Sequence, residues 1–470
     1  MHKFLCFIAV ILFGCSTWAQ VSLDVRAGEL GAVIDNPAEI TELTVSGTVN
    51  ALDLQFMAQK MPQLSVLDLS STRIVEYNGA RVCGAGVHEA DVVPANIFAG
   101  CALVSVSLPE AAISAGAFAL CAELKEIKIN TDSVAFAAFA GCAKLKSITF
   151  LKENTTVGDN AFADCVALSE VVNSQHVAHI GASAFKGCTA LKGFAFGTEI
   201  TEIGPEAFAC SGLESVDFSG AVNLESVGDW ALQGCTALTS VKLGAVPEVG
   251  KGLVFGCSSL KSYQFSATAE EIADYALAKS PVQISELELP QQTLKVGRHA
   301  LSGLSQVTKV TIPEDVQFIG SGAMERMTGL QMINSKATAV PELGEAVWEG
   351  VKALEVELTV PEELLAAYRS AAQWQDFNVK SSSQGIEDIF GDDVVNKVRG
   401  RIVGEELHVE SSNLPITALS VYGTDGRLLA NVADNSQILI VDLAGIPNQV
   451  LLVGVTLSDG SKADLKIIKN

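Results

Sequence analysis

The 470-residue sequence has few aromatic and few basic residues. Phe, Trp and Tyr make up 6% of the chain, whereas apolar residues make up 49% and glycine occurs 40 times. This composition suits many tight turns and small side chains, so it indicates a thin, repetitive architecture. The 31 Lys and Arg are outnumbered by 54 Asp and Glu, which gives a net charge of −23. Nucleic acid and anionic membrane surfaces are therefore not expected partners.

Long apolar runs are lacking after the N-terminus, and none reaches the roughly 18 residues typical of a membrane-spanning helix. Residues 1–19 place Lys3 before a short apolar run and small residues, which is the layout of a secretory signal peptide cleaved after Ala19. A lipoprotein signal is the alternative, because Leu12-Phe13-Gly14-Cys15 approximates a lipobox whose Cys15 would carry the lipid. Both interpretations predict an exported protein without a transmembrane span.

Motifs for catalysis or metal binding are lacking as well. The sequence contains no phosphate loop, no Gly-x-Ser-x-Gly elbow, no HExxH and no paired-cysteine zinc spacing. His176 and His179 have a spacing that can seat two metal ligands, but no third ligand is evident. Glu286 and Glu288 are interpreted as the exposed face of a strand and not as an acid/base pair. We expect no cofactor, no metal and no catalytic residues, and an enzyme is the least favoured class.

A unit of about 23 residues recurs along the middle of the chain, within the range of leucine-rich repeats. In one unit, Ala184 to Leu191 carries apolar residues three and four apart, which predicts a short helical turn. Alternation such as Val241 and Leu243 around Lys242 predicts a short strand. One coil cannot bury its apolar side alone, so stacked coils are expected. The predicted fold is an α/β solenoid of short strands and short helical turns.

The recurring positions are occupied by few residue types. The cysteine position takes Cys101, Cys121, Cys142, Cys165, Cys188, Cys210, Cys235 and Cys257, and the register continues near Pro281, Leu304, Met327 and Val351. A glycine precedes the turn at Gly158, Gly181, Gly204, Gly228, Gly250, Gly297 and Gly320, where we expect it to allow tight backbone curvature.

The cysteine of each unit is interpreted as a small packing residue. Leu304, Met327 and Val351 share apolarity with a thiol and nothing else, which a metal or redox role would not tolerate. A disulfide ladder stays open as the alternative, although helical elements lie roughly 8–10 Å apart, beyond disulfide geometry. Cys83 belongs to no repeat.

The unit IGASAFKGCTALKGFAF, Ile180 to Phe196, resembles the BspA-type leucine-rich repeat of bacterial surface proteins. The resemblance covers residues 90–358, more than half of the chain. It implies a solenoid and a place at the cell surface. Residues 20–89 are expected to form an N-terminal cap and first irregular repeats, with Asn50 capping a helix that carries Leu54 and Met57. Residues 359–380 resemble the segment that closes many such arrays, with Trp374 and Phe377 docked on its final turn.

The C-terminal part is predicted to be a separate domain. Residues 381–398 are polar and acidic and are interpreted as a linker. Residues 399–470 alternate around Asp425-Gly426 and Asp459-Gly460, which predicts hairpins in a small β-sandwich. This domain resembles the type IX secretion sorting domain through Gly426-Arg427, Val455 to Ser461 and the basic finish Lys466 to Lys469. The resemblance implies export across an outer membrane, followed by attachment or release.

The outward strand positions are the candidate partner-binding face. They are Ser105, Ser107, Lys128, Ser147, Thr149, Ser215, Asp217, Ser240, Lys242, Ser262, Gln264, Lys309 and Thr311. This low, hydroxyl-rich face predicts binding or adhesion to a protein or glycan at a host or bacterial surface. A structural surface or matrix component is the alternative function, for which ordinary solvation of the face suffices.

Overall fold

The computed structural model describes residues 19–82, 85–382, 398–411, 414–447 and 449–469. The chain forms two compact units, Met1–Val356 and Glu357–Asn470. Residues 1–18 of the predicted signal peptide, Cys15 among them, the central part of the predicted linker (residues 383–397) and Cys83 lie outside the described residues.

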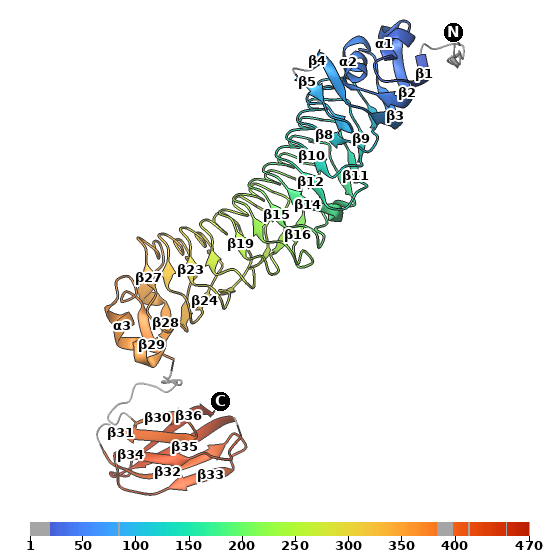
Figure 1. Ribbon diagram of the computed structural model, residues 1–470. Helices are drawn as coiled ribbons and strands as arrows, with labels where there is room; N and C mark the ends of the chain where they lie inside the picture. The colour runs from blue at the N-terminus through green and yellow to red at the C-terminus, as the bar shows by residue number, and fades with distance from the viewer. Residues whose placement is uncertain (1–18, 83–84, 383–397, 412–413, 448, 470) are drawn as a thin grey trace. The chain divides into compact units, whose positions relative to one another are not determined.

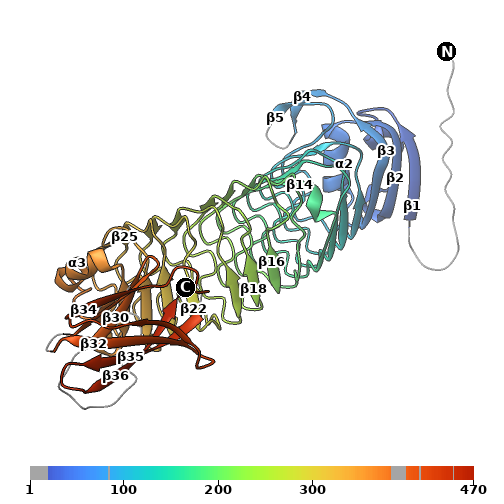
Figure 2. The ribbon, with the colours of Figure 1, turned by 90° about the horizontal axis from the view of Figure 1, so that it is seen from below.

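The first unit is a solenoid of stacked coils, which confirms the predicted fold class (Figure 1). Successive coils place parallel strands side by side in a first sheet, which is interrupted twice. The strands before the first interruption are β1 (Ala19–Val25), β2 (Ile40–Val49), β3 (Val66–Ile74), β7 (Ser105–Ser107), β9 (Glu126–Ile129), β11 (Ser147–Phe150) and β13 (Glu170–Val172). The later strands are β16 (Ser215–Asp217), β18 (Ser240–Lys242) and β20 (Ser262–Gln264), then β22 (Glu286–Glu288), β24 (Lys309–Ile312) and β26 (Met332–Ser335), several of which Figure 2 labels.

A second parallel sheet forms another side of the coils, and the sequence analysis did not predict it. The Ile or Val before each repeat glycine points into the core, as buried Ile180 does, while the preceding residue faces outward. The first ladder contains β6 (Val92–Val93), β8 (Ala112–Ile113), β10 (Ser133–Val134), β12 (Thr155–Val157), β14 (Val177–Ile180), β15 (Glu202–Ile203), β17 (Ser226–Val227) and β19 (Glu248–Val249). A second ladder contains β21 (Glu271–Ile272), β23 (Lys295–Val296), β25 (Phe318–Ile319) and β27 (Glu342–Leu343).

The predicted short helical turn is a run of hydrogen-bonded turns. Every second amide donates to the next coil: the N–H groups of Asn160, Phe162 and Asp164 each donate at 2.8 Å to the carbonyls of Ala182, Ala184 and Lys186. The amides between them bond three residues back within their own coil. This alternation requires two left-handed residues in each coil, such as Ser183 (φ 54°) and Gly187 (φ 74°). The turns are therefore bonded between coils as well as within them.

A column of phenylalanine rings fills the centre of the N-terminal coils. Consecutive ring centroids are 5.3 or 5.4 Å apart and the ring planes differ by 2–13°. The column consists of Phe98, Phe118, Phe139, Phe162, Phe185 and Phe208, all of them buried. Aromatic pairs contribute about 0.5–1.5 kcal/mol each beyond the burial of their area. After Phe208 the same position is taken in turn by buried Leu232, Val254, Leu277 and Leu301.

The repeat glycines permit close approach between coils, which corrects the expectation that they mainly supply curvature. A Cβ added to Gly181 would lie 2.6 Å from the amide nitrogen of Asp159 and 2.7 Å from the carbonyl carbon of Gly158. Gly204 stands in the same relation to Gly181, whose carbonyl carbon would be 2.7 Å away. Glycine is therefore needed for the room that it leaves to the preceding coil, and these residues do not have positive φ.

The N-terminal end of the solenoid has helices of its own: α1 (Leu30–Val33), the 3₁₀ helix η1 (Pro37–Glu39) and α2 (Ala51–Lys60). The predicted cap of α2 is confirmed, because the side chain of Asn50 accepts from the amides of Leu52 and Asp53 in a capping box. Buried Asp53 also accepts from the amides of Gly28 and Leu30, which ties α1 to α2. A hairpin of β4 (Tyr77–Val82) and β5 (Ala85–His88) follows β3. Later in this unit are the 3₁₀ helices η2 (Ser174–His176) and η3 (Ala353–Glu355).

The second unit begins with β28 (Glu357–Val360), η4 (Glu362–Leu364), α3 (Leu365–Ser370) and β29 (Asn378–Ser381). Here β28 and β29 pair in parallel, and the buried rings of Tyr368 and Trp374 meet edge to face at 5.3 Å. The β-domain that follows contains β30 (Val398–Val403), β31 (Glu406–Ser411), β32 (Ile416–Gly423), β33 (Leu428–Val432), β34 (Ile438–Asp442), β35 (Gln449–Leu457) and β36 (Lys462–Lys469).

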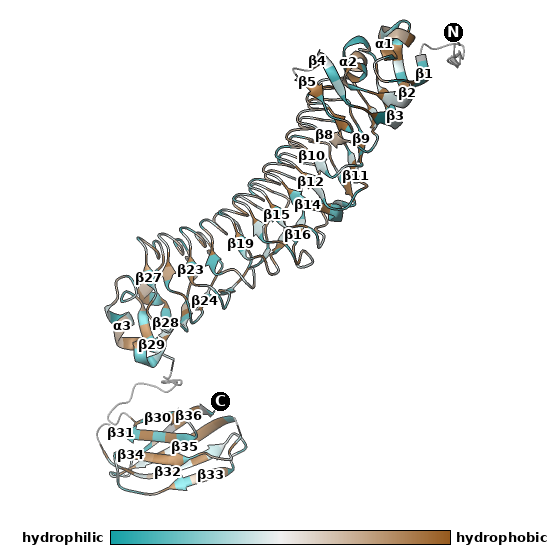
Figure 3. Ribbon diagram, viewed as in Figure 1, coloured by the Kyte–Doolittle hydropathy of each residue, from teal (hydrophilic) through white to brown (hydrophobic). Residues whose placement is uncertain are grey.

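The β-domain consists of two antiparallel sheets, β30-β31-β34 and β33-β32-β35-β36, around one apolar core, as predicted. Hydrophobic and hydrophilic segments alternate along its strands (Figure 3). Gly426 (φ 78°) and Gly460 (φ 83°) lie in the two predicted hairpin turns. The side chain of Lys469 is buried and donates to the carbonyls of Leu443 and Ile446 at 2.7 and 2.8 Å.

We expect Gly181→Ala to lower the free energy of unfolding by about 1–3 kcal/mol, because the added Cβ overlaps the backbone of the preceding coil. Gly220→Ala is the matched control, since a Cβ there meets nothing within 4 Å and should change stability by about 0.5 kcal/mol or less. Urea unfolding of the two variants measures the difference. Equal stability of both variants would contradict the close-approach role.

Candidate functional site

The candidate partner-binding face consists of residues that project outward from the first sheet. The strand register places them in two rows: Ser215, Ser240 and Ser262 lie side by side, and Asp217, Lys242 and Gln264 form the neighbouring row. The residue between the two rows in each strand, such as Val216 or Val241, is buried. Each strand therefore offers two polar side chains to a partner and one apolar side chain to the core.

The thirteen predicted residues lie on the three sections into which the two interruptions divide the first sheet. They therefore form three patches and not one stripe. The first patch consists of Ser105, Ser107, Lys128, Ser147 and Thr149. The second patch consists of the six residues on β16, β18 and β20, and the third consists of Lys309 and Thr311. Lys309 and Thr311 lie beside Glu286 and Glu288, which alternate with buried Leu287 and are exposed on β22, as predicted. The structure thus brings together residues within each patch.

The first interruption lies at Lys192–Gly197, which forms no strand between β13 and β16. A side chain replaces the backbone ladder there: the hydroxyl of Ser174 donates to the carbonyl of Ala195 and accepts from the Ala195 amide, at 3.0 and 2.8 Å. The rings of Phe194 and Phe196 pack inward against Phe208 in edge-to-face geometry. This coil therefore continues the core while its outer side carries only Gly193 and Ala195 between the polar patches.

Lys242 and Lys309 of the face are paired with carboxylates of neighbouring coils, and these charges remain accessible to solvent. Lys242 Nζ lies 3.4 Å from Asp217 Oδ2, and Lys309 Nζ lies 3.5 Å from Glu286 Oε2. Hydrogen bonds from Ser219 and the nearby Lys242 hold the pKa of Asp217 below its usual value. Such exposed pairs contribute at most about 1 kcal/mol, so a partner can exchange them for its own contacts at little cost.

The thiols of the repeat are hydrogen-bond donors in the core. Each donates at 3.0–3.2 Å to a carbonyl of the preceding coil, at the position of the phenylalanine column. This set is Cys121, Cys142, Cys165, Cys188, Cys235 and Cys257, and all eight described cysteines are free. The disulfide alternative is therefore wrong for the described residues. Burial raises the pKa of Cys188 and of Cys257 to about 12, so both thiols stay protonated at neutral pH.

Two predicted occupants of the cysteine position are wrong. Ser211, and not Cys210, takes this position. The segment that follows the position is one residue shorter in this coil than in its neighbours. The Ser211 hydroxyl lies 3.3 Å from Cys235 Sγ. Cys210 is instead exposed in the left-handed conformation (φ 57°) that Gly187 has one coil earlier. Ser280 takes the position in place of Pro281 and donates to the carbonyl of Val254 at 2.7 Å. A hydroxyl therefore serves the position as a thiol does, which points to hydrogen bonding as well as packing.

The second sheet presents a groove that sequence reasoning missed. Its cavity volume is about 680 Å³, and it crosses the coils that contain β15, β17, β19 and β21. Glu202, Glu248 and Glu271 lie at its outward strand positions, and Asp229 and Glu270 also line it. Glu202 Oε2 lies 3.4 Å from His179 Nδ1, and Glu271 Oε1 lies 2.9 Å from Lys295 Nζ. The residue before each Ile/Val-Gly pair is the sequence signal that locates this face.

The histidine pair considered for metal binding falls on η2 and β14 and not on one helical face. His179 lies in an ion-pair position with Glu202, and His176 is half-buried. No group of three or more His, Cys, Asp or Glu residues able to hold a metal occurs within the part of the chain that the structure describes. The same part contains no helix that is long and apolar enough to cross a membrane.

Comparison with known proteins identifies the repeat. A family model described as BspA type Leucine rich repeat region matches six copies, over residues 91–171, 132–253 and 225–355, which together span more than half of the chain. None of the curated proteins matches.

Several solved structures are similar. A leucine-rich repeat protein from Bacteroides ovatus ATCC 8483 is 17% identical with a TM-score of 0.48, over 81% of this chain and 99% of its own. The pneumococcal vaccine antigen PcpA is 13% identical with a TM-score of 0.33, over 77% of this chain and 82% of its own. A leucine rich cell surface protein from Faecalibacterium prausnitzii A2-165 is 16% identical with a TM-score of 0.32, over 70% of this chain and 86% of its own.

We expect a maleimide at pH 8 to modify Cys210 in the folded protein and to leave Cys188 and Cys257 unmodified. Cys210 is exposed, whereas burial keeps the other two thiols protonated and covered. Peptide mass spectrometry of native and urea-unfolded samples measures the modified fraction, and unfolding should make all three react. Rapid native modification of Cys188 would contradict the account of the core.

Proposed function

We propose that this chain, which belongs to the BspA-type leucine-rich repeat family, is an exported binding protein that engages a protein or glycan partner through its first-sheet face. The observation that carries the proposal is the pair of outward polar rows, repeated from coil to coil over an otherwise buried set of strands. Solenoid repeats build extended surfaces of this kind, and adhesion is one use of such a surface.

The chemistry of the rows supports a polar partner. Ser215, Ser240 and Ser262 offer hydroxyls that both donate and accept, and the neighbouring row adds a carboxylate, an ammonium and an amide. Small side chains keep the surface low, so a broad partner can approach several coils at once. A host or bacterial surface protein, or a glycan displayed there, fits this combination of hydroxyls and mixed charge.

Export is part of the same proposal. The predicted signal peptide supports it, and so does the similarity of residues 399–470 to a type IX sorting domain, which would engage the export machinery. That similarity is one of sequence and is based on Gly426-Arg427, Val455 to Ser461 and the basic finish Lys466 to Lys469, of which the first two lie at hairpins of the β-domain. We place the mature protein at the outer membrane surface or in the medium, with a lipid on Cys15 as the alternative anchor.

A structural surface or matrix component is the second candidate function. It is favoured by the solvated polar rows, which need no ligand, and by the repetitive stack itself. An enzyme is less favoured, because leucine-rich repeat proteins are generally binding scaffolds.

We expect Lys242→Glu to weaken partner binding about tenfold or more, because it reverses a charge on the face. Lys295→Glu is the matched control: that lysine is also exposed and also paired with a carboxylate, but it lies on the second sheet. Labelled mature protein is titrated onto purified matrix proteins, a glycan array and cells of the producing host. Saturable binding that only Lys242→Glu weakens supports the proposal, whereas self-association without any such binding favours the matrix function.

We expect deletion of residues 387–470 to retain the protein in the periplasm of its own host, because a sorting domain is needed to cross the outer membrane. Protease shaving of intact cells and immunoblots of cells and medium measure the distribution of the full-length and shortened proteins. Unchanged surface exposure after deletion would refute the sorting role and make substitution of Cys15 the next test of anchoring.

A further inference from the structure

The first unit has one place where both of its sheets are interrupted between the same two coils. The first sheet ends at β20 and resumes at β22, and the second sheet ends at β19 and resumes at β21. At the other interruption, near Lys192–Gly197, the second sheet continues through β14, β15 and β17. Among the described coils, the coil with β19 and β20 and the next coil, with β21 and β22, are therefore the ones that share no strand ladder. We call this place the seam.

The turn side of the seam is weakly bonded as well. In the preceding coil, three amides donate across to the next coil: Trp230 to Lys251, Leu232 to Leu253, and Gly234 to Phe255. At the seam only Gly252 does so, to Asp274 at 2.8 Å. The Ser280 hydroxyl also donates across it to the Val254 carbonyl, and the Gln283 amide donates to the Lys261 carbonyl. The loops that precede β19 and β21 are bonded by the hydroxyls of Ser266 and Thr268 and the amide of Ala267, which donate to the carbonyls of Val246, Ala245 and Gly244.

Ala273 provides one cause of the seam. It occupies the position of the repeat glycines, where an added Cβ meets the backbone of the preceding coil, as at Gly250 and Gly297. The amides of the glycines donate across coils at 2.7–2.8 Å, whereas those of Ala135 and Ser114 at the same position donate at 2.9 and 3.1 Å. The bond is thus kept at Ala135 and Ser114, whereas the amide of Ala273 forms no bond to the preceding coil.

An extra residue provides the second cause. Five positions separate Cys257 from the strand start Ser262, and five separate Leu304 from Lys309. Ser280 and Glu286 are separated by six, in a segment that contains Pro281. The coil is therefore one residue longer between the turn and the strand, and Pro281 in this segment has no amide to donate. Both sheets therefore lose their ladder at the same coil, for different local reasons.

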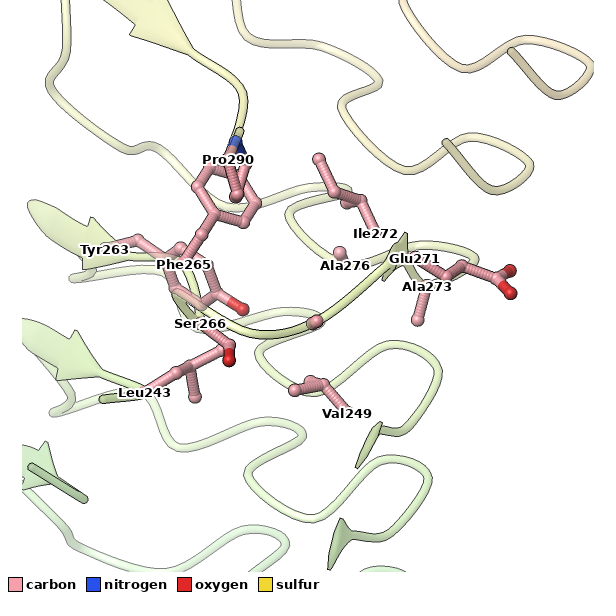
Figure 4. A pocket seen from close by; sticks show the side chains of 11 residues that line it. Leu243, Val249, Tyr263, Phe265, Ser266, Glu271, Ile272, Ala273, Ala276 and Pro290 are labelled. Carbon is pink, nitrogen blue, oxygen red and sulfur yellow. The ribbon is translucent and has the colours of Figure 1, made fainter. Parts of the chain in front are cut away.

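Packing at the seam is incomplete. A cavity of about 20 Å³ lies between the coils, with Tyr263, Phe265 and Pro290 at one end of its lining and Ala273 and Ala276 at the other (Figure 4). In a regular coil the backbone of the preceding coil occupies the space beside the repeat glycine, as it does at Gly204. The cavity removes dispersion contacts from the place that also lacks hydrogen bonds.

We propose that the seam is a joint of the solenoid, at which the coils of residues 40–264 and those of residues 271–356 open and reorient as two cooperative segments. In a stacked repeat, each coil is stabilised by its immediate neighbours alone, so the interface with the fewest contacts opens most often. The joint lies between the second and third polar patches, so its opening changes the angle between Gln264 and Lys309. The proposal rests on the bonding pattern and does not depend on the binding function.

Hydrogen exchange of the mature full chain tests the joint. The amides of Gly252 and Gln283, which donate across the seam, should exchange at least tenfold faster than the amides of Trp230 and Lys261, which make the corresponding bonds across the regular interface before it. Exchange of both sets at the same rate would overturn the proposal, because the seam would then open no more often than a regular interface.

A substitution tests the steric cause. Ala273→Gly removes the Cβ and should slow exchange of residues 252–256 at least threefold, because the coils can then close. Ala300→Gly is the matched control, a buried alanine of a regular coil, and should not slow it. Gly320→Ala, in contrast, should speed exchange across its own interface. If Ala273→Gly protects residues 252–256 no better than Ala300→Gly does, the assignment of the joint to Ala273 is wrong.

Discussion

Each coil must bring its backbone into contact with the backbone of the coil before it, and the rest of the structure depends on this constraint. Three positions of the repeat meet it together. The glycine before the turn leaves room for the neighbouring backbone, the phenylalanine rings stack at about the coil spacing, and the thiol donates to a carbonyl one coil back. A bulky residue at the first position, or a polar atom without a partner at the third, would weaken the contact between coils that have no other core.

The cysteines show how far the sequence could be interpreted. Their spacing and their replacement by Leu304 or Met327 correctly indicated burial in a stacked coil. Ser211 and Ser280 were not recognised as occupants of the cysteine position, because each lies next to the predicted occupant, Cys210 or Pro281. The role of the position in hydrogen bonding was therefore not predicted. An alignment on cysteine alone gives the wrong register for a coil that is one residue short. The two residues with left-handed backbone conformation, four positions apart in each coil, give the correct register.

The second sheet and the seam were not predicted for a related reason. Strands of two residues, such as β15 or β17, carry no periodic signal of their own and are stabilised by the coils on both sides. Their presence depends on the ladder, which is a property of neighbouring coils. The outward residues of the first sheet were easier to name, because alternation within one strand fixes their side, but the patches they form depend on where the ladder breaks.

The solenoid repeats similar polar side chains from coil to coil, and the interruptions of its sheets divide them into separate patches. Lysine footprinting by mass spectrometry tests the binding face most directly, by comparing acetylation of the free protein with that of the protein bound to its partner or to intact host cells. The account predicts that binding protects Lys128, Lys242 and Lys309, which project from the first sheet, and leaves Lys295 on the second sheet reactive. Protection of Lys295 with unchanged labelling of the other three would contradict it.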